Sequence, residues 1–200
     1  LLSSLKLSFG YDRFLDKQQE VIRRLLAGED LCVVMPTGAG KSVCYQLPAL
    51  LKPGYTVVVS PLISLMKDQV DTLCAKNIPA AYINSFVSYP EQQDIQFRTL
   101  RGEIKLLYVA PERFQTVSFQ RLLEESCPDM LVVDEAHCIS QWGHDFRPSY
   151  LKIGEFAKQF HIKQICAFTA TATPQVRRDI KKQLCRENMQ IIAAGFKRPN

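Results

Sequence analysis

Short apolar runs alternate with amphipathic segments along the whole chain, and this alternation limits the possible folds more than any other feature. The apolar runs are rich in Val, Ile and Leu and end at turn residues, so they predict strands at 31–35, 56–60, 80–84, 105–110, 130–134, 164–169 and 190–194. Segments with helical spacing lie between them, at 16–27, 41–51, 62–76, 89–101, 114–125, 149–160 and 174–185. Continuously apolar strands joined through helices predict one α/β domain, with a mainly parallel central sheet covered by helices on both faces.

Small and polar residues follow several of these apolar runs. They read "PTGAGKS", "SPLISL", "APERF", "DEAHC" and "TATAT". Ligands of a parallel sheet bind at the carboxyl ends of its strands, so we expect these segments to meet at one functional edge.

Composition narrows the possible partners. The 200 residues carry a net charge of +5, which permits an acidic polymer as a partner without requiring one. No apolar run reaches the roughly 18 residues that span a bilayer, so we expect no membrane contact and a cytoplasmic location. The seven cysteines form no C-x-x-C pair, which argues against zinc and predicts buried free thiols.

The segment after the first predicted strand has the character of a phosphate-binding loop. It consists of Thr37, Gly38, Ala39, Gly40, Lys41 and Ser42. Gly38 and Gly40 permit the backbone to wrap N–H groups around phosphates, Lys41 reaches the terminal phosphates, and Ser42 offers a hydroxyl to magnesium. Met35 stands where the usual G-x-x-x-x-G-K-[ST] spacing has its first glycine. The alternative is an ordinary glycine-rich turn between a strand and a helix.

A pair of carboxylates follows another apolar run, in "LVVDEAHC". Asp134 at a strand tip can hold magnesium, and Glu135 can orient and deprotonate an attacking water. The alternative is that Asp134 caps a helix and that His137 is a surface side chain. Together with the phosphate loop, the acidic pair predicts hydrolysis of a nucleoside triphosphate.

The motifs together resemble the first motor domain of superfamily 2 helicases, and "DEAHCISQWGHDFRPSY" closely resembles the RecQ DNA helicases. The resemblance implies a RecA-like three-layer domain that uses ATP and Mg²⁺. It also implies a 3′-to-5′ helicase acting on single-stranded and partly duplex DNA. On this reading residues 1–200 are an N-terminal ATP-binding fragment. The second RecA-like motor domain would follow a hinge at 196–200, and the fragment alone would be nearly inactive.

The resemblance also implies roles for individual residues. Lys41, Asp134, Glu135 and His137 match catalytic positions, with Ser42 and Asp134 as magnesium ligands, and His137 matches the link to the later "TAT" segment. Gln18 matches the glutamine that reads adenine, and Tyr11 matches the neighbouring aromatic residue. The family commonly has arginine where this chain has Leu15, and Arg13 is the nearest substitute.

A segment rich in aromatic residues directly follows the acids. The resemblance implies DNA coupling by Gln141, Trp142, His144, Phe146 and Arg147 in this segment, and by Ser60, Ser64, Thr169 and Thr171 at other strand ends. Aromatic faces can stack on unstacked bases, and Arg147 can contact phosphate. The alternative is that Trp142 and Phe146 pack a loop into the core.

Other functions stay open from the sequence. One is a different superfamily 2 translocase, acting on RNA or in a restriction complex. Another is a P-loop kinase, although "DEAH" and "TAT" are not typical of kinases. A third is a non-catalytic DNA-binding module, which the intact Lys41, Asp134 and Glu135 disfavour.

Overall fold

The computed structural model describes residues 1–194, so the predicted hinge at 196–200 lies outside the described residues. The helices are α1 Leu2–Phe9, α2 Gln18–Leu26, α3 Lys41–Leu51, α4 Ile63–Ala75, α5 Tyr89–Leu100, α6 Val117–Glu125, α7 Ile153–Gln159 and α8 Pro174–Gln183. The strands are β1 Leu31–Val34, β2 Thr56–Val59, β3 Ala80–Ile83, β4 Leu106–Val109, β5 Met130–Val133, β6 Ile165–Thr169 and β7 Gln190–Ala193. Short 3₁₀ helices are η1 Pro111–Gln115, η2 Ala136–Ile139 and η3 Pro148–Lys152.

The strands form one seven-stranded sheet in the order β3-β4-β2-β5-β6-β1-β7, and all neighbouring strands pair in parallel. Val34 at the end of β1 pairs with Thr169 at the end of β6, and Val59 of β2 pairs with Val133 of β5. The carboxyl ends of these strands therefore lie at one edge of the sheet, where the five polar segments were expected to meet.

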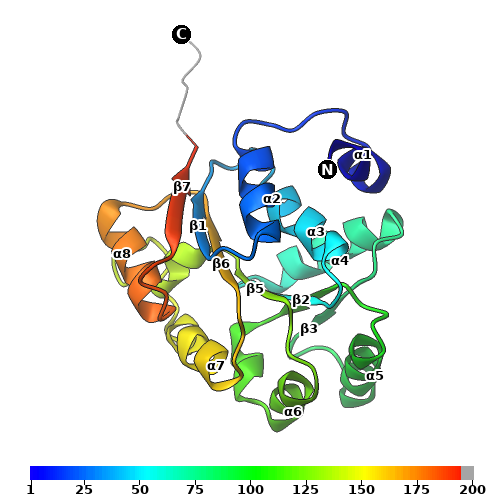
Figure 1. The fold of residues 1–200 in the computed structure, drawn as a ribbon. Helices are drawn as coiled ribbons and strands as arrows, with labels where there is room; N and C mark the ends of the chain where they lie inside the picture. The colour runs from blue at the N-terminus through cyan, green and yellow to red at the C-terminus, as the bar shows by residue number, and fades with distance from the viewer. Residues whose placement is uncertain (195–200) are drawn as a thin grey trace.

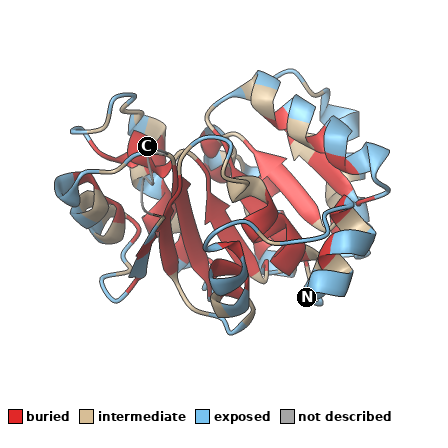
Figure 2. Cartoon of the chain, turned by 90° about the horizontal axis from the view of Figure 1, so that it is seen from above, coloured by how far each residue is buried: buried red, intermediate tan, exposed pale blue. Residues whose placement is uncertain are grey.

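Two apolar cores flank the sheet and establish its three layers. Alternate strand residues face opposite sides. Those facing one side, including Val58 and Val132, pack with buried residues of α1 to α4. Those facing the other side, including Val57 and Val133, pack with buried residues of α6 to α8. Strands β1 to β6 are largely buried, whereas the edge strand β7 and the outer helix surfaces are mostly exposed (Figure 2). Figure 1 shows the helices on both sides of the sheet. The predicted α/β class and parallel sheet are confirmed.

All seven predicted strands are present, whereas one helix was not predicted and two others begin later than predicted. Helix α1 was not predicted, because Leu2 and Leu7 are exposed while Leu5 and Phe9 are buried, so the apolar residues do not mark a single face. The helices predicted from residues 114 and 149 begin at Val117 and Ile153 instead, after 3₁₀ turns that each start at a proline.

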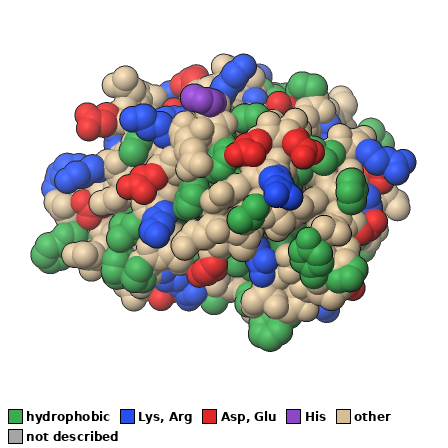
Figure 3. Space-filling model, turned by 90° about the horizontal axis from the view of Figure 1, so that it is seen from below, with side chains coloured by type: hydrophobic (Ala, Val, Ile, Leu, Met, Phe, Trp, Pro, Cys, Tyr) green, Lys and Arg blue, Asp and Glu red, His purple; other side chains and the backbone are tan. Residues whose placement is uncertain are grey.

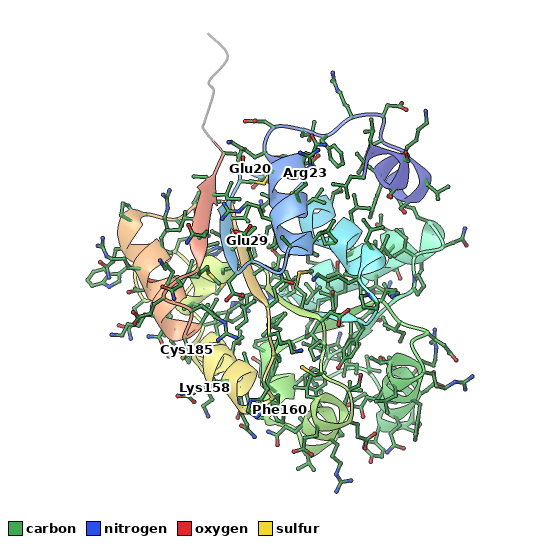
Figure 4. The ribbon with its side chains drawn as sticks, viewed as in Figure 1. Glu20, Arg23, Glu29, Lys158, Phe160 and Cys185 are labelled. Atoms are coloured by element: carbon green, nitrogen blue, oxygen red, sulfur yellow. The ribbon has the colours of Figure 1, made fainter. Side chains whose placement is uncertain are left out.

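The cysteines are free, but the prediction that they are buried is only partly right. Cys32, Cys44, Cys138 and Cys166 are buried, whereas Cys74, Cys127 and Cys185 are exposed. Cys185 follows α8, in the region of Lys158 and Phe160 at the end of α7 (Figure 4). Within residues 1–194, no helix is both long and apolar enough to cross a bilayer. On the face shown in Figure 3, acidic and basic side chains are interspersed among hydrophobic ones.

Candidate nucleotide-binding and catalytic site

The phosphate loop joins β1 to α3 at the carboxyl edge of the sheet. Gly38 and Gly40 have φ angles of 82° and 71°, in the left-handed region that favours glycine, and Gly40 is the N-cap of α3. Met35 is fully buried, its N–H donates to Thr169 O at 3.1 Å, and its Sδ lies 3.9 Å from Cys44 Sγ. The methionine therefore fills the core under α3, and the loop forms without a glycine at that position.

The polar groups of the loop converge at the N-terminus of α3. The Lys41 ammonium donates to the carbonyl of Met35 at 3.2 Å, so a cation lies within the loop. Thr37 is exposed, and Ser42 lies half-buried in the first turn of α3. Backbone N–H groups, a helix N-terminus and a lysine in one place make a site suited to phosphate.

A cavity of about 460 Å³ adjoins the loop. It is lined by Gly10, Tyr11, Asp12, Arg13, Leu15, Gln18, Gly38, Gly40 and Val43. The buried Gln18 amide accepts from Leu15 N at 2.7 Å and donates to Gly40 O at 3.1 Å, so it ties the cavity to the phosphate loop. The predicted base-reading residues Tyr11 and Gln18 thus share one cavity with two loop glycines. Leu15 and Arg13 line it as well.

Asp134 directly follows β5 and is 8% exposed. Its N–H donates to Val59 O at 2.9 Å, so strand pairing with β2 continues through this residue. Its carboxylate accepts from Glu135 N at 3.0 Å. Burial, followed by the charge of Glu135, raises the pKa of Asp134 to about 6.

Glu135 differs from its neighbour in both backbone and environment. Its φ of 48° places a non-glycine residue in the left-handed region, a strained conformation that recurs at functional sites. The side chain is half-buried, and its hydrogen bond with His137 lowers the pKa of its carboxyl. Glu135 is therefore ionised at neutral pH, as a general base must be.

His137 lies between the acidic pair and β6. Its Nδ1 is 3.2 Å from Glu135 Oε2 and 3.0 Å from Thr169 Oγ1. Thr169 Oγ1 donates to Thr171 O at 3.0 Å, and the His144 ring stacks on His137 with ring centres 3.9 Å apart. One histidine therefore contacts Glu135 of the acidic pair, Thr169 of the "TAT" segment and His144 of the aromatic-rich segment.

The aromatic-rich segment presents Trp142 to solvent. The Trp142 side chain is 73% exposed, which excludes the alternative that it packs into the core. Gln141 and His144 are also exposed, while Phe146 and Arg147 are half-buried. Arg147 donates to Asp145 Oδ2 at 3.0 Å and to Pro61 O at 2.9 Å.

Sequence reasoning missed the contact that anchors this segment to α8. Ser140 Oγ donates to Asp179 Oδ2 at 2.6 Å and accepts from Trp142 N at 3.1 Å. Asp179 lies in the basic run "RRDIKK", whose composition gives no sign of a contact with Ser140.

The two serines expected to contact DNA lie in different environments. Ser64 is exposed, beside a groove of about 800 Å³ that Lys67 and Phe86 also line. Ser60 is 2% exposed, and its hydroxyl is buried without a hydrogen-bond partner among the described residues. In this conformation the Ser60 hydroxyl is not available to a phosphate, unlike that of Ser64.

A comparison of the sequence with known protein families finds one family that matches most of the chain. The sequence model of the DEAD/DEAH box helicases matches residues 16–180, which include the phosphate loop, the acidic pair and the "TAT" segment. The chain belongs to the DEAD/DEAH box helicase family. This membership removes the kinase alternative.

Among curated relatives, the similarity is to RecQ helicases. The chain is 49% identical to the "ATP-dependent DNA helicase RecQ" of Haemophilus influenzae over 199 residues, covering 100% of this chain and 32% of the relative. It is also 49% identical to the protein of that name from Bacillus subtilis, covering 96% and 33%. The RecQ resemblance inferred from the motifs is confirmed, and the chain spans about a third of the length of these relatives.

Solved structures agree on the fold. A hypothetical ATP-dependent RNA helicase from Sulfolobus tokodaii superposes with a TM-score of 0.73 at 20% identity, covering 97% of this chain and 57% of the other. The DUF1998 helicase MrfA bound to DNA and AMPPNP gives 0.73 at 17% identity, covering 96% and 29%. The predicted RecA-like helicase fold is therefore confirmed, and at these identities the comparison speaks for the fold alone.

Proposed function

We propose that this chain is the ATP-binding motor half of a 3′-to-5′ DNA helicase, which couples ATP hydrolysis to translocation on single-stranded DNA and to duplex unwinding. The support is the 49% identity to RecQ helicases, together with the arrangement at the carboxyl edge of the sheet. The whole enzyme would act on single-stranded and partly duplex DNA in repair and recombination. Its location would be cytoplasmic, at the nucleoid in a bacterium.

Residues 1–200 would form the N-terminal RecA-like ATP-binding domain, and a second RecA-like domain of the same chain would complete the motor. The coverage of about a third of the bacterial relatives leaves room for such a domain. In two-domain motors of this kind, an arginine from outside the phosphate loop stabilises the transition state, with effects of roughly 10³–10⁵ in rate.

The residues at the loop fit a magnesium-bound nucleotide. Ser42 and Asp134 offer the hard oxygen ligands that Mg²⁺ prefers. Lys41 and the N-terminus of α3 would hold the phosphates, and the 460 Å³ cavity at Gln18 would hold the base. Bound ATP supplies the phosphoanhydride bond, and the ion offsets charge on its oxygens.

The catalytic step would rest on Glu135 and His137. Glu135 is held ionised by His137 and would accept a proton from the attacking water. His137 would keep the Glu135 carboxylate in place and connect it to Thr169 at the tip of β6. The remaining loop residues, Thr37, Gly38, Ala39 and Gly40, would contribute backbone N–H groups.

DNA would reach this site through the aromatic-rich segment. Exposed Trp142 offers a face for an unstacked base, and the His144–His137 stack connects the same segment to the acidic pair. Gln141, Phe146, Arg147, Ser64, Thr169 and Thr171 would take part in the coupling, and Ser60 would join only if its side chain turned outward.

Within the structure, the single observation that best supports coupling of hydrolysis to DNA is the position of His137. It contacts both Glu135 and Thr169, and its ring stacks on that of His144. A non-catalytic DNA-binding module has no use for such a link, and a restriction or RNA translocase would not need this aromatic segment. These two remain the alternative functions.

Calorimetry with ADP in the presence of magnesium tests the nucleotide site. We expect binding by the wild-type chain and none by Lys41→Ala, because the mutant lacks the cation of the loop. Lys163→Ala is the matched control, since exposed Lys163 precedes β6 at the opposite edge of the sheet. Equal binding by Lys41→Ala and Lys163→Ala would refute the assignment.

A further inference from the structure

The aromatic-rich segment is closed on itself and tightly packed at its base. Arg147 N donates to Cys138 O at 2.9 Å, so the two ends of the segment are joined. Inside the segment, Gly143 N donates to Ser140 O at 2.9 Å. Gly143 also lies so close to His137 O that a side chain at this position would overlap that oxygen. The backbone of the segment therefore has little room to move at this end.

One buried hydroxyl fixes the backbone of Trp142. Ser140 is 1% exposed, and its Oγ accepts from Trp142 N at 3.1 Å. The same Oγ donates to Asp179 Oδ2 on α8 at 2.6 Å. A hydroxyl has one hydrogen to donate, so the carboxylate that takes this hydrogen determines how the hydroxyl is turned. Asp179 therefore leaves the lone pairs of Ser140 directed to Trp142 N, and a bond to a carboxylate is the stronger kind.

Helix α8 gives Asp179 a firm support. The helix begins directly after the "TAT" segment, and the side chain of its N-cap, Thr173, accepts from Val176 N at 3.3 Å. Val176 and Ile180 are buried in the core, so the inner face of the helix is held in place. The second carboxylate oxygen of Asp179 accepts from Gln175 Nε2, one turn earlier, at 3.1 Å. The aromatic-rich segment is therefore anchored to a helix that starts at the "TAT" segment.

The charges of α8 make this use of Asp179 notable. Asp179 is the only acidic residue of the helix, and four basic residues flank it in "RRDIKK". Within residues 1–194, however, Asp179 forms no ion pair with any of them. Its carboxylate is directed at the Ser140 hydroxyl instead. The contact with the aromatic-rich segment is therefore the specific interaction of this side chain.

We propose that Asp179 is a positioning residue, which holds Trp142 in place for single-stranded DNA by fixing the Ser140 hydroxyl. The inference rests on the proposed coupling of DNA to hydrolysis and adds a residue outside the recognised motifs. Without Asp179 the segment would take up several positions, and only the fraction with Trp142 in place would respond to DNA. The DNA concentration needed for stimulation rises as this fraction falls, whereas saturating DNA draws all molecules into the responsive state.

Titration of the ATPase of the full-length protein with single-stranded DNA tests this role in Asp179→Ala. We expect the DNA concentration for half-maximal stimulation to rise roughly tenfold, as for the loss of one hydrogen bond to a charged group. The rate without DNA and the rate at saturating DNA should stay close to wild type. Asp179→Asn should restore the wild-type concentration, because the amide oxygen can still accept from Ser140.

Asp129→Ala is the matched control. Asp129 is half-buried like Asp179, and its Oδ2 accepts from Gly54 N at 2.6 Å, before β5 at the opposite edge of the sheet. This variant should lose stability while its half-maximal DNA concentration matches wild type. A second measurement uses Trp142, the only tryptophan of the 200 residues, whose fluorescence anisotropy reports motion of the segment. In this chain, fast decay of the anisotropy should increase in Asp179→Ala and stay unchanged in Asp129→Ala.

Each other outcome decides the matter. A wild-type half-maximal concentration in Asp179→Ala, or wild-type anisotropy decay, would overturn the inference, whatever the maximal rate. An equal rise in Asp129→Ala, or an Asp179→Ala variant that does not fold, would also overturn it, because the side chain would then serve stability alone. An equal rise in Asp179→Asn would show that the charge matters rather than the bond to Ser140. Absence of stimulation by DNA in the wild-type protein would instead refute the proposed function, and this inference with it.

Discussion

Replacing Asp134 with asparagine should stabilise the chain at neutral pH in the absence of magnesium. The amide side chain of the Asp134→Asn variant would keep nearly the same shape and could still accept from Glu135 N, but would never ionise. In the wild-type chain the folded structure holds a buried carboxylate whose pKa is about 6, against an ordinary value of 3.8. The folded state therefore binds this proton more tightly than the unfolded state does.

The magnitude and its sign follow from proton linkage. A pKa that is about two pH units higher in the folded than in the unfolded state changes the free energy of unfolding by ~3 kcal/mol between low and high pH. The stability that tighter proton binding by Asp134 gives is fully present below pH 4. It is lost as pH rises through about 6, because the buried Asp134 carboxyl must then ionise in the folded state. Asp134→Asn should therefore match wild type near pH 4 and exceed it by up to ~3 kcal/mol at pH 8.

Urea denaturation in EDTA at several pH values from 4 to 8 measures the difference. EDTA removes divalent cations, which would otherwise favour the ionised wild-type carboxylate. A variant that is less stable than wild type at pH 8, or a difference that does not change with pH, would refute the reasoning about Asp134.

Two further substitutions test the proposed roles in the full-length protein. Glu135→Gln should bind ATP as wild type does but lose turnover by at least about 100-fold, because the amide cannot accept the proton of water; near-normal turnover would assign the base elsewhere. Trp142→Ala should change the melting temperature little, because the side chain is 73% exposed, while stimulation of ATPase by single-stranded DNA should fall sharply. A marked loss of stability with intact stimulation would give Trp142 a structural role instead.

The fold could be predicted from the sequence because its signals are local. Each strand is a short apolar run bounded by turn residues. Strands β1 to β6 are largely buried on both faces, and such strands favour continuous runs of apolar residues. Helix α1 escaped prediction because exposed Leu2 and Leu7 obscure the face formed by Leu5 and Phe9. Its position depends on contacts with α3, which no local pattern records.

The site divides in the same way. The phosphate loop and the acidic pair are each a short continuous stretch of sequence, so the chemistry of each can be recognised directly. The burial of Ser60 and the Ser140–Asp179 contact depend on which strands and helices become neighbours within residues 1–194. These features arise from packing between distant segments, and only the structure reveals them.

The most direct test of the account is ATP turnover by the full-length protein with and without nucleic acid. We predict slow magnesium-dependent hydrolysis without nucleic acid and strong stimulation by single-stranded DNA. The Lys41→Ala substitution should abolish the stimulated rate. Stimulation by RNA in place of DNA would favour the alternative translocase. Absence of hydrolysis under both conditions, with DNA binding intact, would contradict the motor assignment and favour a non-catalytic module.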